Sequence, residues 1–93
     1  MYKINEYFEG NVKSISYKTS DGPATVGVMA RGEYTFNTSS EELMTVISGS
    51  MEVLLPGDDN WKNYKEFGAF IVPAGAEFRV KVLEDTAYRC YYR

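Results

Sequence analysis

The sequence contains no histidine, and this absence excludes several classes of active site. Without an imidazole there is no His-based catalytic triad, no imidazole general base and no His-rich metal site. Cys90 is the only cysteine, so neither an internal disulfide nor a thiolate zinc cluster can form. Cys90 alternates with Tyr88 and Tyr92, as strand residues do, which favours a small buried side chain over a nucleophile.

Strong charge of either sign and long apolar segments are also missing. A formal net charge of −3 gives no field that attracts polyanions, so we expect no binding to nucleic acid or anionic membranes. Residues 1–10, MYKINEYFEG, contain neither an apolar signal core nor a membrane-length segment. The sequence contains neither of the glycine-rich nucleotide-binding motifs, G-x-x-x-x-G-K-[ST] and G-x-G-x-x-G. We therefore expect a cytoplasmic protein whose partner is a small molecule or another protein.

The composition is that of a globular protein. The chain has 93 residues, 44% of them apolar and 15% aromatic. A chain of this length has room for one hydrophobic core, so we expect residues 1–93 to form a single domain.

Short apolar or alternating segments, separated by turn residues, follow one another along the chain. No ten-residue stretch has the 3.6-residue periodicity of a helix, so we predict an all-β fold with no long helix. About eight short strands are expected, at residues 12–18, 24–30, 33–38, 42–48, 50–56, 69–73, 77–83 and 86–92. The tripeptide at 48–50, Ser-Gly-Ser, predicts a tight hairpin. Strands at this spacing favour a sandwich or small barrel.

Alternation predicts which side chains face the interior. Phe78, Val80 and Val82 share one face of their strand and should be buried, whereas Arg79 and Lys81 on the other face should lie in solvent.

Residues 42–48 are apolar on both faces. One face carries Met44 and Val46, and the other carries Leu43 and Ile47. A strand of this kind packs on the core with one face and on a neighbouring subunit with the other, so we expect a homodimer.

Several polar residues interrupt the apolar strands, with donors and acceptors suited to a sugar or an oxyanion. They are Lys13, Ser14, Glu33, Thr35, Thr38, Glu42, Thr45 and Ser48. Strand hydroxyls also bond to neighbouring backbone, and Lys13 also fits an edge position in solvent, so both interpretations stay open. Glu42 differs, because a carboxylate on an apolar face is unfavourable unless it is paired, protonated or hydrogen-bonded.

Two stretches resemble the two motifs of the cupin family: E-x6-G at residues 42–49 and GAFIVPAGAEF at residues 68–78. In metal cupins two histidines precede the glutamate and a third follows the Pro-x-Gly. Phe36 and Thr38 take the first two of these positions here, and Phe78 takes the third. The resemblance therefore implies a cupin jelly-roll barrel with its pocket but without its metal ion.

A closer resemblance covers nearly the whole chain. The strings that carry it are NEYF (5–8), VKSI (12–15), VGVM (26–29), GEYTF (32–36), MTVISG (44–49), VLLP (53–56) and Y-x-C-x-Y (88–92). They resemble the small bacterial pyrimidine/purine nucleoside phosphorylases, which have a cupin fold. This resemblance implies a pentosyltransferase, a nucleoside phosphorylase acting on diverse purine and pyrimidine nucleosides. Inorganic phosphate would be the co-substrate, free base and α-D-ribose 1-phosphate the products, with no metal or other cofactor.

The implied reaction assigns roles to the polar residues. As an anion, Glu42 would bind ribose hydroxyls and stabilise the cationic sugar; with a raised pKa it would protonate the departing base instead. We favour the anionic role. Hydroxyl donors would come from Thr38, Thr45 and Ser48. Lys13 is the favoured cation for phosphate. The alternatives for phosphate are Arg31, Arg79 and Arg89.

Aromatic residues offer surfaces on which a base could stack, although each of them also fits a position in the core. They are Tyr34, Phe36, Phe78 and Tyr88. Two competing hypotheses remain: a non-enzymatic, histidine-free cupin that binds a sugar, nucleoside or small organic acid, and a purely structural dimeric barrel.

Overall fold

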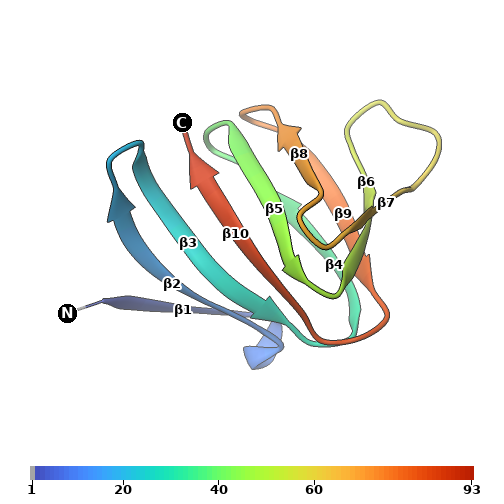
Figure 1. Cartoon of the computed structure of the whole chain (residues 1–93). Helices are drawn as coiled ribbons and strands as arrows, with labels where there is room; N and C mark the ends of the chain where they lie inside the picture. The colour runs from blue at the N-terminus through green and yellow to red at the C-terminus, as the bar shows by residue number, and fades with distance from the viewer. Residues whose placement is uncertain (1) are drawn as a thin grey trace.

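The computed structural model describes residues 2–93, which form two antiparallel β-sheets (Figure 1). One sheet has six strands in the order β1-β2-β3-β10-β5-β8, and the other has four in the order β4-β9-β6-β7. The strands are β1 Lys3–Tyr7, β2 Val12–Thr19, β3 Gly22–Met29, β4 Gly32–Asn37, β5 Glu42–Ser48, β6 Ser50–Leu54, β7 Lys62–Lys65, β8 Ala69–Val72, β9 Glu77–Val82 and β10 Thr86–Tyr92. The only helical element in this range is a single 3-10 turn, η1 Phe8–Gly10. The predicted all-β fold is confirmed, and no helix within residues 2–93 could span a membrane.

All eight predicted strands are present, together with β1 and β7, which the sequence does not predict. Both additional strands lie at an edge: β1 at the end of the six-stranded sheet and β7 at the end of the four-stranded sheet. Their sequences, KINEY and KNYK, are mostly exposed on both faces, so they lack the apolar alternation that marks a strand in the interior.

The predicted hairpin at residues 48–50 is wrong. β5 pairs with β10 and β8, whereas β6 pairs with β7 and β9, so the chain crosses from one sheet to the other at Gly49. Gly49 has a φ of +87°, and a Cβ there would lie 2.6 Å from the Thr86 hydroxyl. A glycine with positive φ suits any sharp change of chain direction. The tripeptide Ser-Gly-Ser therefore does not reveal whether the strand after it pairs with the strand before it.

The interior between the sheets is apolar where the two sheets overlap. Phe78, Val80 and Val82 of β9 are at most 2% exposed. Arg79 is exposed and Lys81 is half-buried on the opposite face of the strand, as alternation predicts. On β5, Met44 and Val46 enter the same core. Packing of these inward-facing side chains holds the two sheets together, because it removes their apolar area from water.

The inner face of the six-stranded sheet becomes polar toward β1. Asn5, Ser14, Ser16 and Thr25 lie on this face, in rows set by the registers Asn5↔Ser14 and Ser16↔Thr25. Figure 1 shows β1, β2 and β3 to the side of the strands that the four-stranded sheet covers. The inner face thus becomes polar where the four-stranded sheet no longer covers it.

The outer face of the six-stranded sheet is apolar and exposed. Ile15, Val26, Val28 and Ile71 are 45%, 40%, 50% and 52% exposed. Arg89 lies among them, opposite Val26 in the register of β10 with β3. We call this surface the outer face.

Candidate functional site

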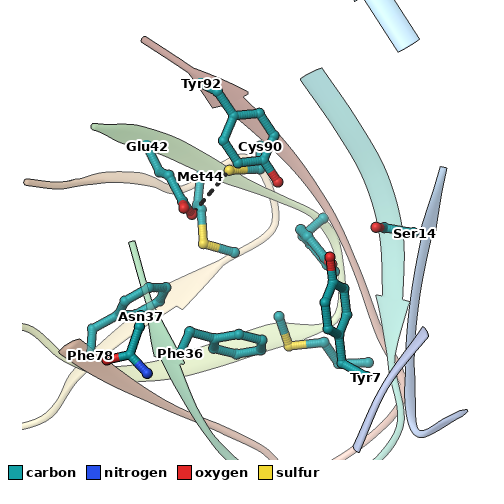
Figure 2. A pocket seen from close by; sticks show the side chains of 11 residues that line it. Tyr7, Ser14, Phe36, Asn37, Glu42, Met44, Phe78, Cys90 and Tyr92 are labelled. Atoms are coloured by element: carbon teal, nitrogen blue, oxygen red, sulfur yellow. Dashed lines mark hydrogen bonds between the residues drawn. The ribbon is translucent and has the colours of Figure 1, made fainter. Parts of the chain in front are cut away.

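A pocket of about 180 Å³ opens between the two sheets. Strands of both sheets contribute the side chains that line it: Tyr7, Ser14, Met29, Phe36, Asn37, Glu42, Met44, Phe78, Tyr88, Cys90 and Tyr92. In Figure 2, Glu42, Met44, Cys90 and Tyr92 lie on one side and Phe36, Asn37 and Phe78 on the other. We call it the Glu42 pocket.

Glu42, the first residue of β5, is half-buried and reaches into the pocket from the six-stranded sheet. The Cys90 thiol donates a hydrogen bond to its Oε1 over 3.4 Å. Burial raises the pKa of the Glu42 carboxyl above its ordinary value, and the bond from Cys90 opposes this only in part. Within the described residues, no Lys or Arg lines the pocket to offset the burial. The surroundings therefore raise the pKa of Glu42, which is the direction a general acid requires, while the anionic role favoured from the sequence stays a prediction.

Cys90 is 2% exposed, which confirms the buried position predicted for it. Burial raises the pKa of its thiol, and the negative charge of the nearby Glu42 carboxyl raises it further. A thiol with a raised pKa is a poor nucleophile at neutral pH and remains a hydrogen-bond donor. Cys90 is therefore suited to orienting Glu42 and not to attacking a substrate.

Tyr88 extends over β3 because residue 27 is a glycine. A Cβ on Gly27 would lie 2.8 Å from the Tyr88 ring and hydroxyl, and 2.6 Å from the carbonyl oxygen of Lys13. Burial raises the pKa of Tyr88 to about 12, while the nearby Ser14 hydroxyl acts in the opposite direction. The phenol therefore keeps its proton at neutral pH and can donate to a bound ligand.

The opposite wall is aromatic. Phe36 of β4 and Phe78 of β9 stack with ring centroids 5.5 Å apart and planes inclined by 28°. Asn37 follows Phe36 at the end of β4 and is exposed at the rim. These rings give the pocket a flat apolar surface facing the carboxyl.

The residues at the metal-ligand positions of cupins do not fit a metal ion. Phe36 and Phe78 offer no donor atom. The Thr38 hydroxyl donates to the Pro73 carbonyl over 2.6 Å and accepts from the Ala76 amide over 3.0 Å. Across residues 2–93 no three His, Cys, Asp or Glu side chains form a cluster that could hold a metal. The positions that hold the metal in cupins therefore supply no metal-binding donor set in this chain.

The structure brings four of the predicted site residues into the Glu42 pocket: Glu42, Phe36, Phe78 and Tyr88. Two others lie elsewhere on the inner side of the fold. Thr38 is committed to the backbone bonds just described, and the hydroxyl of the buried Tyr34 donates to the Ala30 carbonyl over 2.5 Å.

The remaining three predicted residues lie away from the Glu42 pocket. Lys13, on the outer face, has its ammonium 3.4 Å from Glu6. Thr45, also on that face, accepts a bond of 3.5 Å from Arg89. Ser48 is exposed at the end of β5. Period-2 alternation separates the faces of β2 and β5 but does not identify the inner one when both are apolar.

Ser14, one of the polar candidates named from the sequence, also lines the pocket. The sequence assigned no pocket role to the other lining residues, which are Tyr7, Met29, Asn37, Met44, Cys90 and Tyr92. A signal existed for Tyr92, which alternates with Tyr88 and Cys90 and therefore shares their face. Tyr7 lies on the unpredicted β1, so no alternation was available for it. The Tyr92 hydroxyl lies 3.0 Å from that of Thr25, and burial raises the pKa of this phenol.

Comparisons of this sequence and structure with known proteins identify one family. The family model for pyrimidine/purine nucleoside phosphorylase matches residues 2–92. A pyrimidine/purine nucleoside phosphorylase from Pseudomonas paraeruginosa is 55% identical over 93 residues, covering 100% of both chains. A solved structure of a protein of unknown function from Vibrio parahaemolyticus superposes with a TM-score of 0.96 at 39% identity, covering 100% of this chain and 99% of that one.

A more distant structure bears on the fold alone. An RmlC-like cupin from Shewanella frigidimarina superposes with a TM-score of 0.72 at 16% identity, covering 96% of this chain and 80% of that one. The predicted cupin jelly-roll fold is thereby confirmed.

Proposed function

The chain belongs to the pyrimidine/purine nucleoside phosphorylase family, and we propose that it cleaves purine and pyrimidine nucleosides with inorganic phosphate, releasing the free base and α-D-ribose 1-phosphate. The observation that carries the proposal is the pairing in one pocket of a carboxyl of raised pKa with a wall of stacked phenylalanine rings. An acid and a flat apolar surface suit a nucleoside, whose base is a planar ring and a leaving group that needs a proton.

The reaction is a displacement at C1′ of the ribose. The C1′–N bond breaks and its electron pair goes to the base, while a phosphate oxygen forms a new bond to C1′. The base gains one proton from Glu42, while the hydrogen phosphate carries its proton into the sugar phosphate. The sugar phosphate then releases that proton to solvent and the Glu42 carboxylate takes one up from solvent, so that atoms and charge balance. Because the transition state has the character of an oxocarbenium ion, protonation of the leaving base lowers the barrier.

Individual side chains have separate roles in this proposal. The ring of Phe36, backed by the buried ring of Phe78, stacks on the base, and any purine or pyrimidine offers a π face, which fits broad specificity. The hydroxyls of Tyr88 and Ser14 lie at the end of the pocket that faces β2 and hold the ribose. Cys90 orients Glu42 through its hydrogen bond and is a positioning residue.

The test is incubation of the pure protein with uridine or inosine, with and without phosphate, followed by chromatography of the released base. We expect base release that requires phosphate and persists in the presence of a chelator, since we propose a reaction independent of metal. No release from any nucleoside would overturn the proposal.

One observation favours the second candidate, a non-enzymatic module that binds a sugar, nucleoside or small organic acid. Among the described residues that line the Glu42 pocket there is no cation to hold a phosphate group. Nucleoside binding detected by calorimetry, without base release at any phosphate concentration, would support this candidate.

We also propose that the protein acts in the cytoplasm as a homodimer whose second copy covers the outer face. The face carries exposed apolar residues on several adjacent strands, and contiguous patches of this kind mark interaction sites. Arg89 lies in its middle, 4.7 Å from the Tyr91 ring, and within residues 2–93 its buried Nε has no hydrogen-bond partner.

A further inference from the structure

The Glu42 pocket lacks a group that phosphorolysis needs. Phosphate is a dianion near neutral pH, and proteins hold it with Lys, Arg or several hydrogen-bond donors. The pocket's described lining offers hydroxyls and one carboxyl, but no cation. The Lys13 ammonium lies beside Glu6 on the outer face, and Arg79 bonds to Glu33 on the outer side of the other sheet. The phosphate therefore needs another site near the sugar.

A second, open cavity of about 600 Å³ lies on the uncovered inner face of β1, β2 and β3. Lys3 and Lys18 both line it, together with the hydroxyls of Ser16 and Thr25. Lys3, Ser16 and Thr25 form one row across the three strands, because Ser16 pairs with Lys3 on one side and with Thr25 on the other. We call it the lysine cavity.

Two hydrogen-bonded links join the lysine cavity to the Glu42 pocket. The Asn5 amide donates to Ser14 over 3.2 Å and to Ser16 over 3.0 Å; Ser14 lines the pocket and Ser16 lines the cavity. Tyr92 lines both spaces, and its hydroxyl lies 3.0 Å from that of Thr25. The two spaces are thus neighbours that share a wall of polar side chains.

We propose that the lysine cavity is the phosphate site, with Lys3 and Lys18 as cations and Ser16 and Thr25 as donors, while the nucleoside lies in the Glu42 pocket. The inference rests on the proposed function. The arrangement separates the phosphate from the carboxylate that Glu42 becomes when it gives its proton to the base, which avoids repulsion between the two anions. The attacking phosphate oxygen meets C1′ at the wall formed by Tyr92 and Thr25, and the base leaves on the side of Glu42.

The test compares a double variant, Lys3→Gln with Lys18→Gln, with the wild type and with a second double variant, Lys62→Gln with Lys65→Gln. Lys62 and Lys65 are exposed lysines of β7 in the other sheet, and their replacement removes the same two charges. We expect the double variant to raise the KM for phosphate by about tenfold or more, because each ammonium makes charge-assisted bonds to the dianion. The KM for the nucleoside should remain close to that of the wild type. Circular dichroism verifies the fold of each variant.

Binding of inorganic phosphate, followed by phosphorus NMR without nucleoside, separates this inference from the proposed function. Phosphate binding that the double variant loses supports the cavity site even if the wild type releases no base, an outcome that overturns only the phosphorylase function. Turnover with an unchanged phosphate KM in the double variant overturns the cavity site and leaves the function standing. A loss of phosphate affinity in Lys13→Gln instead would also overturn it and assign phosphate to the outer face. Absence of both turnover and phosphate binding overturns both proposals.

Discussion

Glu42 and Cys90 influence each other's protonation, because the thiol donates to the carboxyl and the carboxylate charge raises the thiol pKa. Burial dominates the pKa of both groups. A carboxyl in such surroundings retains its proton to a higher pH than one in water, which is what a general acid requires.

The first prediction concerns the chemistry of Glu42. Replacing Glu42 by Gln should lower kcat by about 10²–10⁴-fold, because the amide cannot donate a proton and regain it. In the wild type, kcat should fall as the pH rises through the raised pKa of this carboxyl. Steady-state kinetics across the pH range measures both effects.

Glu41→Gln is the matched control, since Glu41 lies outside the pocket, with Oε1 3.8 Å from Arg93. A wild-type rate in a folded Glu42→Gln protein would leave Glu42 a structural residue. A wild-type kcat that falls toward low pH instead would restore the anionic role.

The second prediction concerns stability. The folded-state pKa of Glu42 lies above the unfolded value, so its contribution to stability is fully present below the unfolded pKa and is lost as the pH rises through the folded one. Glu42→Gln removes this loss. The Tm of the variant relative to the wild type should therefore increase as the pH rises from about 4, near the unfolded pKa, through the raised folded-state pKa. Thermal unfolding at several pH values tests this, and a difference independent of pH would contradict it.

At the scale of the strand, alternation predicted the interior well and the edges poorly. It identified β9 correctly because Phe78 and Val80 contrast with a charged opposite face. It missed β1 and β7 because edge strands exposed on both faces show no such contrast. The cupin motif located Glu42 in the pocket. The reaction implied by the family resemblance assigned a hydroxyl-donor role to Thr38. The backbone of the 73–76 turn engages that hydroxyl, and no sequence pattern reports such a contact.

The third prediction concerns Gly27, the residue of β3 over which the Tyr88 side chain extends. Gly27→Ala should cost about 1–3 kcal/mol, because its Cβ would meet the Lys13 carbonyl, a backbone atom of the paired strand that has little room to shift. Tyr88 should move away from Ser14, raising the KM for the nucleoside. Chemical denaturation and kinetics measure the two effects.

Gly57→Ala provides a control for this prediction. Gly57 has a φ of +80° and no neighbouring atom within 4 Å of the added Cβ, so this variant suffers backbone strain alone. Its cost should be about 1–2 kcal/mol, with unchanged kinetics. An equal loss of nucleoside affinity in both variants would show that Tyr88 does not bind the ribose.

At the scale of the whole molecule, the outer face explains why β5 is apolar on both sides. Met44 enters the core, whereas Ile47 is exposed on the face that carries Ile15 and Val26. A chain that exposes such a face gains from association, because covering it removes apolar area from water.

The fourth prediction tests this face. Val26→Lys places a second cation beside Arg89, opposite Val26 in the sheet, and should convert the dimer to a folded monomer. Analytical ultracentrifugation measures the change. Leu83→Lys is the control, because Leu83 is 66% exposed and lies in the turn between β9 and β10. A wild-type protein that sediments as a monomer would refute the dimer.

The position of β10 has a consequence for the order in which the molecule can fold. This last strand is not at an edge but lies between β3 and β5, pairing Tyr88 with Gly27 on one side and with Val46 on the other. β1 to β3 can form a meander and β5 can pair with β8, yet neither group can join the other until β10 inserts between β3 and β5. The edges of β3 and β5 that β10 covers therefore stay open to other chains until this strand is in place, the stage of folding in which this fold is most prone to aggregate.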